Sequence, residues 1–453
     1  MSSRSFVNQT SDMNKILLWS LTAAMAGFLF GFDTVVISGA DQTLQALWNS
    51  SDFFHGTVVI AMALWGTVVG ALFGGIPSQK WGRKNTLLLI GILYTVSALG
   101  SALAHDPWTF ALFRFLGGLG VGASTIAAPA YISEVAPAEN RGRFVGFYQF
   151  NIVLGILVAF VSNYALSGLG ASAWRWMMGV EAIPALAYTF LVLGIPKSPR
   201  WLYVQGREDE ARHIIQSAYG PGEAEALIQE ISKDHEATPP KESIFASKYR
   251  FILWLTFFIA FFNQFSGINA FLYYAPRIFE EGGLGASSAL LSSIGIGLVN
   301  LIFTLVGINL IDRLGRRVLM YIGSVGYIAS LTLIALSFIL QWEGMALPLF
   351  LFLFIASHAI GQGAVIWVYI SEIYPNHLRS AGQSFGTSTH WVLAALIPSM
   401  VPVLFGLVGA GVVFACFAVM MVFQLLFVHF MMPETRGVSL ESLSAKLLNS
   451  AND

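Results

Sequence analysis

Charged side chains are scarce in this sequence. Lysine, arginine, aspartate and glutamate make up 11% of the 453 residues, whereas hydrophobic residues make up 56%. Soluble proteins carry about 25% charged residues, so this composition excludes an ordinary water-soluble enzyme, and its hydrophobicity excludes a disordered chain. The formal net charge of −1 leaves no basic excess for binding nucleic acid.

Cysteine is almost absent as well. Cys416 is the single cysteine, which excludes a disulfide framework and a cysteine-ligated zinc cluster. Nothing in the sequence pairs a nucleophile with a base. We therefore expect neither an enzyme nor a bound metal or cofactor.

Long apolar runs, in contrast, are abundant. A helix needs about 20 apolar residues to cross a bilayer core of about 30 Å, and 36 phenylalanines and 44 glycines are typical of such helices. The sequence predicts an all-α membrane protein whose twelve transmembrane helices lie near residues 15–40, 53–77, 84–104, 107–135, 143–167, 174–195, 248–279, 287–311, 316–340, 346–373, 380–405 and 408–432.

Basic residues gather in alternate connections between these runs. Such residues remain on the cytoplasmic side of a membrane. If the predicted spans are numbered in chain order, the connections that follow an odd-numbered span (odd-to-even) hold mainly Arg175 and Arg277. We therefore expect a protein of the cell membrane with both termini in the cytoplasm. The basic residues of the even-to-odd connections are Lys80, Arg83, Lys84, Arg141, Arg143, Arg313, Arg316, Arg317 and Arg379.

One segment departs from the apolar pattern. Between Lys197 and Arg250 lie 17 of the chain's 24 basic and 25 acidic residues, in a stretch with helical composition. The segment contains no nucleotide-binding loop and no metal-ligand spacing. We interpret it as solvated cytoplasmic linker helices, in preference to a catalytic domain.

Motifs of the first part of the chain recur in the second. Glu134-x-x-Pro-x-x-x-Arg141 returns as Glu372-x-x-Pro-x-x-x-Arg379, Gly82-Arg83-Lys84 returns as Gly315-Arg316-Arg317, and Asp33 aligns with Asn269. Parallel repeats are typical of rocking transporters, with the binding site between the halves. The predicted organisation is a six-helix bundle (1–195), linker helices (196–247), a second six-helix bundle (248–432) and a cytoplasmic tail (433–453).

These motifs together resemble the sugar porter family of the major facilitator superfamily. The resemblance is carried by residues 27–40 (GFLFGFDTVVISGA), 129–141 (PAYISEVAPAENR), 264–276 (QFSGINAFLYYAP), 312–317 (DRLGRR), 367–379 and 433–437 (PETRG). It implies transport of a neutral sugar by alternating access. The family usually has prolines just before the tryptophan of span ten, where this chain has Ala364 and Ile366.

Two opposite charges lie deep in apolar runs. A charge at the bilayer centre costs about 2.5–3.5 kcal/mol on insertion scales, so we expect Asp33 and Arg114 to pair. Separating the two side chains favours protonation of the carboxylate, which would couple transport to a proton. The alternative is a permanent ion pair that only fixes the packing of the helices. The resemblance favours coupling, because proton-linked members carry an Asp and an Arg at these positions and animal facilitators lack the Asp. For Glu181, near the Pro184 break, we favour a structural role over that of a buried helper.

A neutral sugar needs amides and aromatic faces. Amides in the spans must face protein or a cavity, although each is about as suited to joining helices as to binding a ligand. Gln264 and Asn269, five residues apart, share a face only if the helix unwinds, whereas Asn269 and Tyr273 share one. The resemblance implies that the sugar contacts are Phe30, Gln149, Asn263, Gln264, Asn269, Tyr273, Asn300, Trp367, His390 and Trp391.

Charged residues of both signs are predicted at the cytoplasmic ends of the spans. We expect salt bridges between the halves that close the inside, although orientation alone would explain the basic members. This latch comprises Arg83, Glu134, Arg141, Asp312, Arg316, Arg317, Glu372 and Arg379.

The sequence therefore predicts a symporter of a proton and a neutral hexose or pentose. A passive sugar facilitator of the same fold is the first alternative, and a non-transporting sugar receptor is the second. The expected partners are the monosaccharide, the proton and the lipid bilayer, with no nucleic acid, and we expect a monomer.

Overall fold

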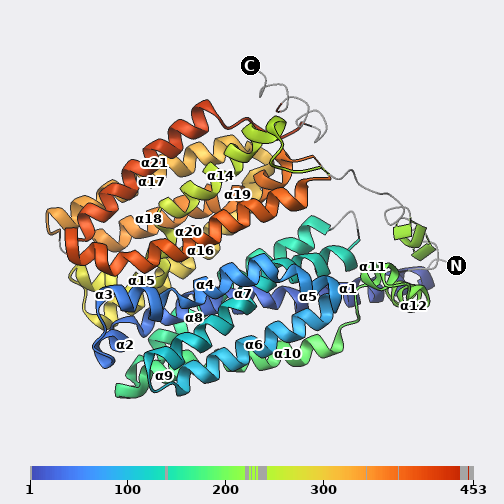
Figure 1. Cartoon of the computed structure of the whole chain (residues 1–453), viewed down its shortest axis with the longest axis horizontal. Helices are drawn as coiled ribbons and strands as arrows, with labels where there is room; N and C mark the ends of the chain where they lie inside the picture. Colours follow the sequence, from blue (N-terminus) through green and yellow to red (C-terminus); the bar gives the residue numbers. More distant parts are fainter. Residues whose placement is uncertain are drawn as a thin grey trace.

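The computed structural model describes residues 3–137, 141–219, 224–225, 227–229, 231–232, 242–342, 344–375, 377–438 and 447. These residues form helices and no β-strand. The helices gather in two bundles that lie side by side, one from each half of the chain (Figure 1).

The first bundle holds the helices that precede the charged linker. They are α1 (Ser3–Val36), η1 (Ile37–Gly39), α2 (Asp41–Leu47), α3 (Asp52–Phe54), η2 (His55–Ile60), α4 (Met62–Phe73), α5 (Gly75–Lys80), α6 (Arg83–Leu103), α7 (Pro107–Val135), α8 (Arg141–Leu166), η4 (Ser167–Ser172), α9 (Ala173–Gly179) and α10 (Ala182–Gly194).

The second bundle holds the helices that follow the linker. They are η5 (Ser247–Tyr249), α14 (Arg250–Phe265), α15 (Ile268–Glu281), α16 (Ala286–Leu314), α17 (Arg316–Ile339), α18 (Ala346–Ile360), α19 (Gln362–Ile373), α20 (Arg379–Val408) and α21 (Ala410–Phe430).

Twelve crossings fit these helices, as the sequence predicts. Ten stretches of the described residues are long and apolar enough to span a membrane, and the bent pair Asp52–Ile60 with Met62–Phe73 makes an eleventh. One of the ten, Arg141–Gly194, has 54 residues, which is too long for a single crossing. It contains α8 and, after the turn at residues 167–172, the shorter pair α9 and α10.

Several crossings are broken near their middle. Gly267, between α14 and α15, has φ +85°, a left-handed conformation that glycine adopts without steric cost. Gly361 separates α18 from α19, and a Cβ on the facing Gly323 would lie 2.8 Å from the Gly361 Cα. Such breaks expose backbone and side-chain polar groups, which are tolerated in a membrane only where protein or a cavity receives them.

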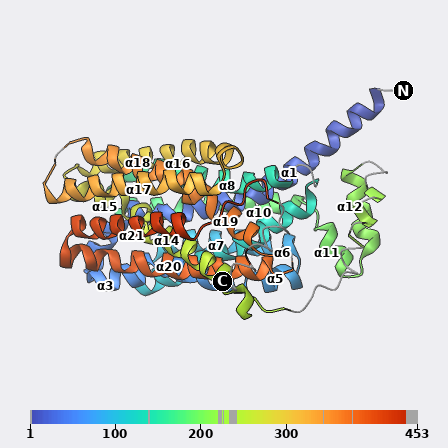
Figure 2. The same cartoon turned by 90° about the horizontal axis from the view of Figure 1, so that it is seen from above.

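The linker contributes α11 (Pro199–Val204) and α12 (Glu208–Ala218), which lie beside the start of α1 (Figure 2). The Tyr219 hydroxyl ties them to the first bundle by donating to the Val135 carbonyl oxygen at 2.7 Å. We call this end of the molecule the linker end. Residues 220–223, 226, 230 and 233–241 of the predicted linker, and 439–446 and 448–453 of the predicted tail, lie outside the described residues.

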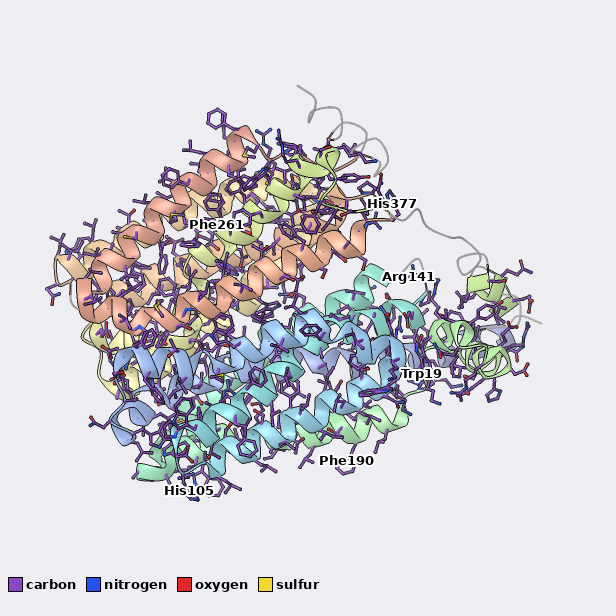
Figure 3. The ribbon with its side chains drawn as sticks, viewed as in Figure 1. Trp19, His105, Arg141, Phe190, Phe261 and His377 are labelled. Atoms are coloured by element: carbon purple, nitrogen blue, oxygen red, sulfur yellow. The ribbon has the colours of Figure 1, made fainter. Side chains whose placement is uncertain are left out.

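The opposite end carries α2 and α9, and we call it the loop end. Arg141 and His377 lie toward the linker end, whereas His105 lies at the loop end (Figure 3). The bundles meet where α16 packs on α8 and α20 packs on α4 and η2. Glycines permit this approach, since a Cβ on Gly56 would lie 2.3 Å from the Ser399 carbonyl oxygen.

Candidate functional site

Asp33 and Arg114 form the buried pair that the sequence predicts. The Arg114 Nη1 donates to the Asp33 carboxylate at 2.5 Å, and its Nη2 donates to the Asp33 backbone oxygen at 2.9 Å. Both residues are about 1% exposed, so the pair between α1 and α7 is buried inside the protein. Because the same guanidinium holds both the side chain and the backbone of Asp33, a change in this pair also acts on the last turn of α1.

Glu181 joins this pair. It lies at the break between α9 and α10, it is 1% exposed, and it is close enough to Asp33 and Arg114 to interact with their charges. Its Oε1 is buried without a hydrogen-bond partner among the described residues. Glu181 is therefore a second acid beside the pair, and the structural role that we favour for it from the sequence stays a prediction. No spacing in the sequence links it to Asp33.

Tyr273 brings the second bundle to this cluster. It is 2% exposed on α15, which contacts α1, and it is close enough to Asp33 and Arg114 to interact with their charges. A side chain of one bundle thus contacts the surroundings of the ion pair in the other.

The break at Gly267 brings Gln264 and Asn269 together. The Asn269 Nδ2 donates to the Gln264 Oε1 at 2.7 Å, and the Gln264 Nε2 donates to the Asn263 Oδ1 at 2.9 Å. The helix is therefore unwound between the two residues. From the sequence, Gln264 and Asn269 are expected to share a face only if the helix unwinds there. Asn263 and Gln264 lie at the end of α14, whereas Asn269 and Tyr273 lie on α15, so the row of amides crosses the break.

Aromatic side chains form a second wall. The rings of Phe30 and Trp391 lie 5.6 Å apart across the two bundles, and the His390 ring lies 5.0 Å from both Trp367 and Trp391. The Gln264 Nε2 lies 3.2 Å from the His390 Nδ1. Neighbouring amides and aromatic faces suit a neutral polyol, whose C–H face stacks on rings and whose hydroxyl groups pair with amides.

Gln149 and Asn300 stand apart from this hydrogen-bonded group. They lie on α8 and α16, which pack against each other between the bundles. Asn300 accepts a long hydrogen bond of 3.4 Å from Thr304, and Gln149 is half-buried. Both remain predicted sugar contacts, each on a helix that borders the other bundle.

The predicted latch residues form ion pairs within their own bundles in this structure. The Arg83 Nη2 lies 2.8 Å from the Glu134 Oε1, and Arg316 binds Glu372 at 2.7 Å and Asp312 at 3.0 Å. Arg317 donates to backbone oxygens of α21, while Arg141 and Arg379 begin α8 and α20. A latch that joins the bundles through these residues stays a prediction.

An ionic contact between the bundles lies instead at the loop end. The Asp41 carboxylate, 1% exposed, lies 3.1 Å from the Arg277 Nε and 2.6 Å from the His55 Nε2. Arg277 also donates to Gln45. Asp41 and His55 were not predicted from the sequence. The only sequence feature that pointed to this contact was Arg277, because few other basic residues lie in the odd-to-even connections.

The arrangement suits transport of a small neutral solute. Among the described residues, no group of three or more histidine, cysteine, aspartate or glutamate side chains could hold a metal ion. What the two bundles enclose is an ionisable cluster, a row of amides and an aromatic wall. These features define a multi-pass membrane transporter.

Comparison with known proteins identifies the family. The profile of the family described as "Sugar (and other) transporter" matches residues 19–447. The chain is 33% identical to a glucose transport protein of Synechocystis sp., over 96% of this chain and 98% of that protein. It is 32% identical to a D-xylose-proton symporter of Escherichia coli strain K12, over 97% of each. The chain therefore belongs to the sugar porter family of the major facilitator superfamily, and it is a sugar transporter of the plasma membrane rather than an enzyme.

Solved structures agree in fold. The chain superposes on the inward open conformation of the xylose transporter XylE from E. coli with a TM-score of 0.85 and 30% identity, over 95% of this chain and 99% of that chain. Its TM-score to XylE bound to 6-bromo-6-deoxy-D-glucose is 0.78, over 96% of this chain and 100% of that chain.

Proposed function

We propose that this protein carries a neutral hexose or pentose together with a proton by alternating access. The supporting observation is the buried cluster of Asp33, Arg114 and Glu181 in one bundle, reached by Tyr273 from the other. A carboxylate beside a guanidinium stays ionised, and parting the two favours proton uptake. Rocking of the bundles moves Tyr273 relative to the pair and so links sugar binding to protonation.

The sugar lies between the amides and the aromatic wall in this proposal. Phe30 and Gln149 supply contacts from the first bundle. Relatives named as symporters or transporters of xylose, arabinose and glucose support a monosaccharide. The linker end faces the cytoplasm, and its charged residues exchange partners when that side closes. The contacts from the second bundle are Asn263, Gln264, Asn269, Tyr273, Asn300, Trp367, His390 and Trp391.

The test is transport by purified protein in liposomes. We expect Asp33→Asn to abolish uphill sugar uptake driven by a pH gradient while sugar counterflow continues, because an amide cannot release a proton. Asp106→Asn is the matched control, since Asp106 is an exposed acid of the same bundle and asparagine also caps a helix. Uphill uptake that survives in Asp33→Asn refutes the assignment. Counterflow without pH-driven accumulation in the wild type indicates a passive facilitator, and binding without counterflow indicates a receptor.

A further inference from the structure

A row of hydrogen-bonded side chains continues from the amides to the far edge of the second bundle. α17 and α21 form this edge, on the side remote from the first bundle (Figure 1). Ser324 of α17 and Gln424 of α21 are completely buried there. The Gln424 Nε2 donates to the Ser324 Oγ at 2.8 Å, and its Oε1 accepts from the Gln362 Nε2 at 2.8 Å.

Ser324 fixes the direction of this row. Its hydroxyl hydrogen is given to the Met320 carbonyl oxygen at 2.7 Å, one turn earlier in the same helix. A hydroxyl group has only one hydrogen to donate, so the Ser324 Oγ can only accept from Gln424. The amide of Gln424 must then turn its nitrogen to Ser324 and its oxygen to Gln362.

The orientation of each amide fixes the orientation of the next one in the row. The Gln362 oxygen accepts from the Asn263 Nδ2 at 3.5 Å, which is the longest step, and the Asn263 oxygen accepts from Gln264. Gln264 in turn accepts from the Asn269 nitrogen. The row ends with the Asn269 Oδ1, which accepts no hydrogen bond from the described part of the chain and is left to accept one from a ligand.

We propose that Gln424, together with Ser324, is a positioning residue that fixes which face of the amide row is presented to the sugar. The inference rests on the proposed function, because it assumes a monosaccharide in the pocket. Gln424 itself does not touch the sugar. It prevents the amides from rotating by 180°, so a sugar hydroxyl that donates to Asn269 always meets an oxygen and not an N–H group.

A simpler role would be to join helices. Buried amides often hold membrane helices together, and Gln424 does connect α21 with α17 and with the start of α19. Such a role changes stability and leaves the relative affinity for different sugars unaltered. The positioning role changes which hydroxyl groups of the sugar are recognised, so the two can be separated by measuring binding.

The experiment is equilibrium binding of D-xylose, D-glucose and L-arabinose to the purified full-length protein, followed by monodeoxy analogues of the sugar that binds most tightly. We expect Gln424→Leu to weaken binding of that sugar by roughly 3- to 10-fold, the effect of one neutral hydrogen bond. We also expect it to reduce the preference for that sugar over the analogue that lacks the hydroxyl donating to Asn269. Ser324→Ala, which removes a smaller group, should act in the same direction.

A control variant and a double variant complete the experiment. Ser330→Ala is the matched control, because Ser330 is a buried serine of the same helix whose hydroxyl donates to carbonyl oxygens of α17; its affinity should equal that of the wild type. In the double variant, Ser324→Ala should add nothing to Gln424→Leu, since residues of one network are not additive. If Gln424→Leu does not fold, the sugar affinity and preference of Ser324→Ala test the positioning role.

The outcomes are distinct. A lower melting temperature with unchanged sugar affinity and unchanged preference in Gln424→Leu or Ser324→Ala overturns the positioning role and leaves the proposed function intact. A wild type that binds none of the three sugars overturns the proposed function and this inference with it.

Discussion

The two bundles bury different polar groups at positions that the internal repeat aligns. The first buries two acids, Asp33 and Glu181, with the guanidinium of Arg114, whereas the second places amides beside His390 around the aligned Asn269. A charge in the membrane is costly and needs a partner, but an amide is satisfied by another amide. In the proposed function, the first bundle responds to the proton and the second recognises the uncharged sugar.

Removing the cation of the first bundle should have the largest effect. We expect Arg114→Gln to lower the free energy of unfolding by about 3–5 kcal/mol, because it leaves a buried carboxylate unpaired. Thermal unfolding in detergent measures this change. The double variant Asp33→Asn with Arg114→Gln should lose much less, and an Arg114→Gln protein that melts at the wild-type temperature would show that the pair is not electrostatically important.

A smaller effect is expected where the bundles are joined. Asp41→Asn removes the ion pair with Arg277 and weakens the hydrogen bond with His55, and a hydrogen bond to a charged group is worth about 1.5–3 kcal/mol. The population should shift toward a form that is open at the loop end. Distances between spin labels on α2 and the end of α15 measure this shift, and Asp106→Asn, an exposed acid of the same bundle, is the control. An unchanged distance distribution in Asp41→Asn contradicts the role of Asp41.

The smallest effect comes from placing an acid in the neutral bundle. In Asn269→Asp the new carboxylate faces the oxygen of Gln264 with no hydrogen to donate, and loss of that hydrogen bond should weaken sugar binding by about 0.5–1.5 kcal/mol. Binding should recover as the pH falls, because the introduced carboxyl group donates again once it is protonated. Titration of sugar affinity with pH checks this prediction. The wild type, which keeps Asn269, should show no such recovery, and equal pH profiles for the two proteins would contradict the assignment of the Asn269 amide as a donor to Gln264.

The positions of the spans could be read from the sequence, because they follow from composition alone. The predicted run 107–135 matches α7 (Pro107–Val135), and 84–104 differs by one residue at each end from α6 (Arg83–Leu103). The breaks within spans could not be predicted in the same way. Span ten breaks at Gly361 without the prolines that the family usually has nearby, at the point where Gly323 of another helix packs closely against it.

The candidate site likewise contains features that the sequence predicted and features that it did not. The cost of a lone buried charge predicted the pairing of Asp33 with Arg114, which is present in the structure. The closeness of Glu181 to Asp33 and the hydrogen bond between Gln424 and Gln362 were not predicted, because each pair lies on helices distant in the chain and neither residue has a motif around it. The cytoplasmic latch and the individual sugar contacts remain predictions.

Composition and repetition along the chain were enough to establish that it crosses a membrane many times, in two related halves, and which few charges must be compensated there. These properties depend on how much apolar length and how many charges the chain has, and a bilayer imposes the same requirement on any fold. The partners of the polar groups depend on the packing of the helices: Asp41 meets Arg277, and Gln424 meets Gln362. Hydrogen bonds act over about 3 Å, so these pairs form only because helices far apart in the chain are brought into contact.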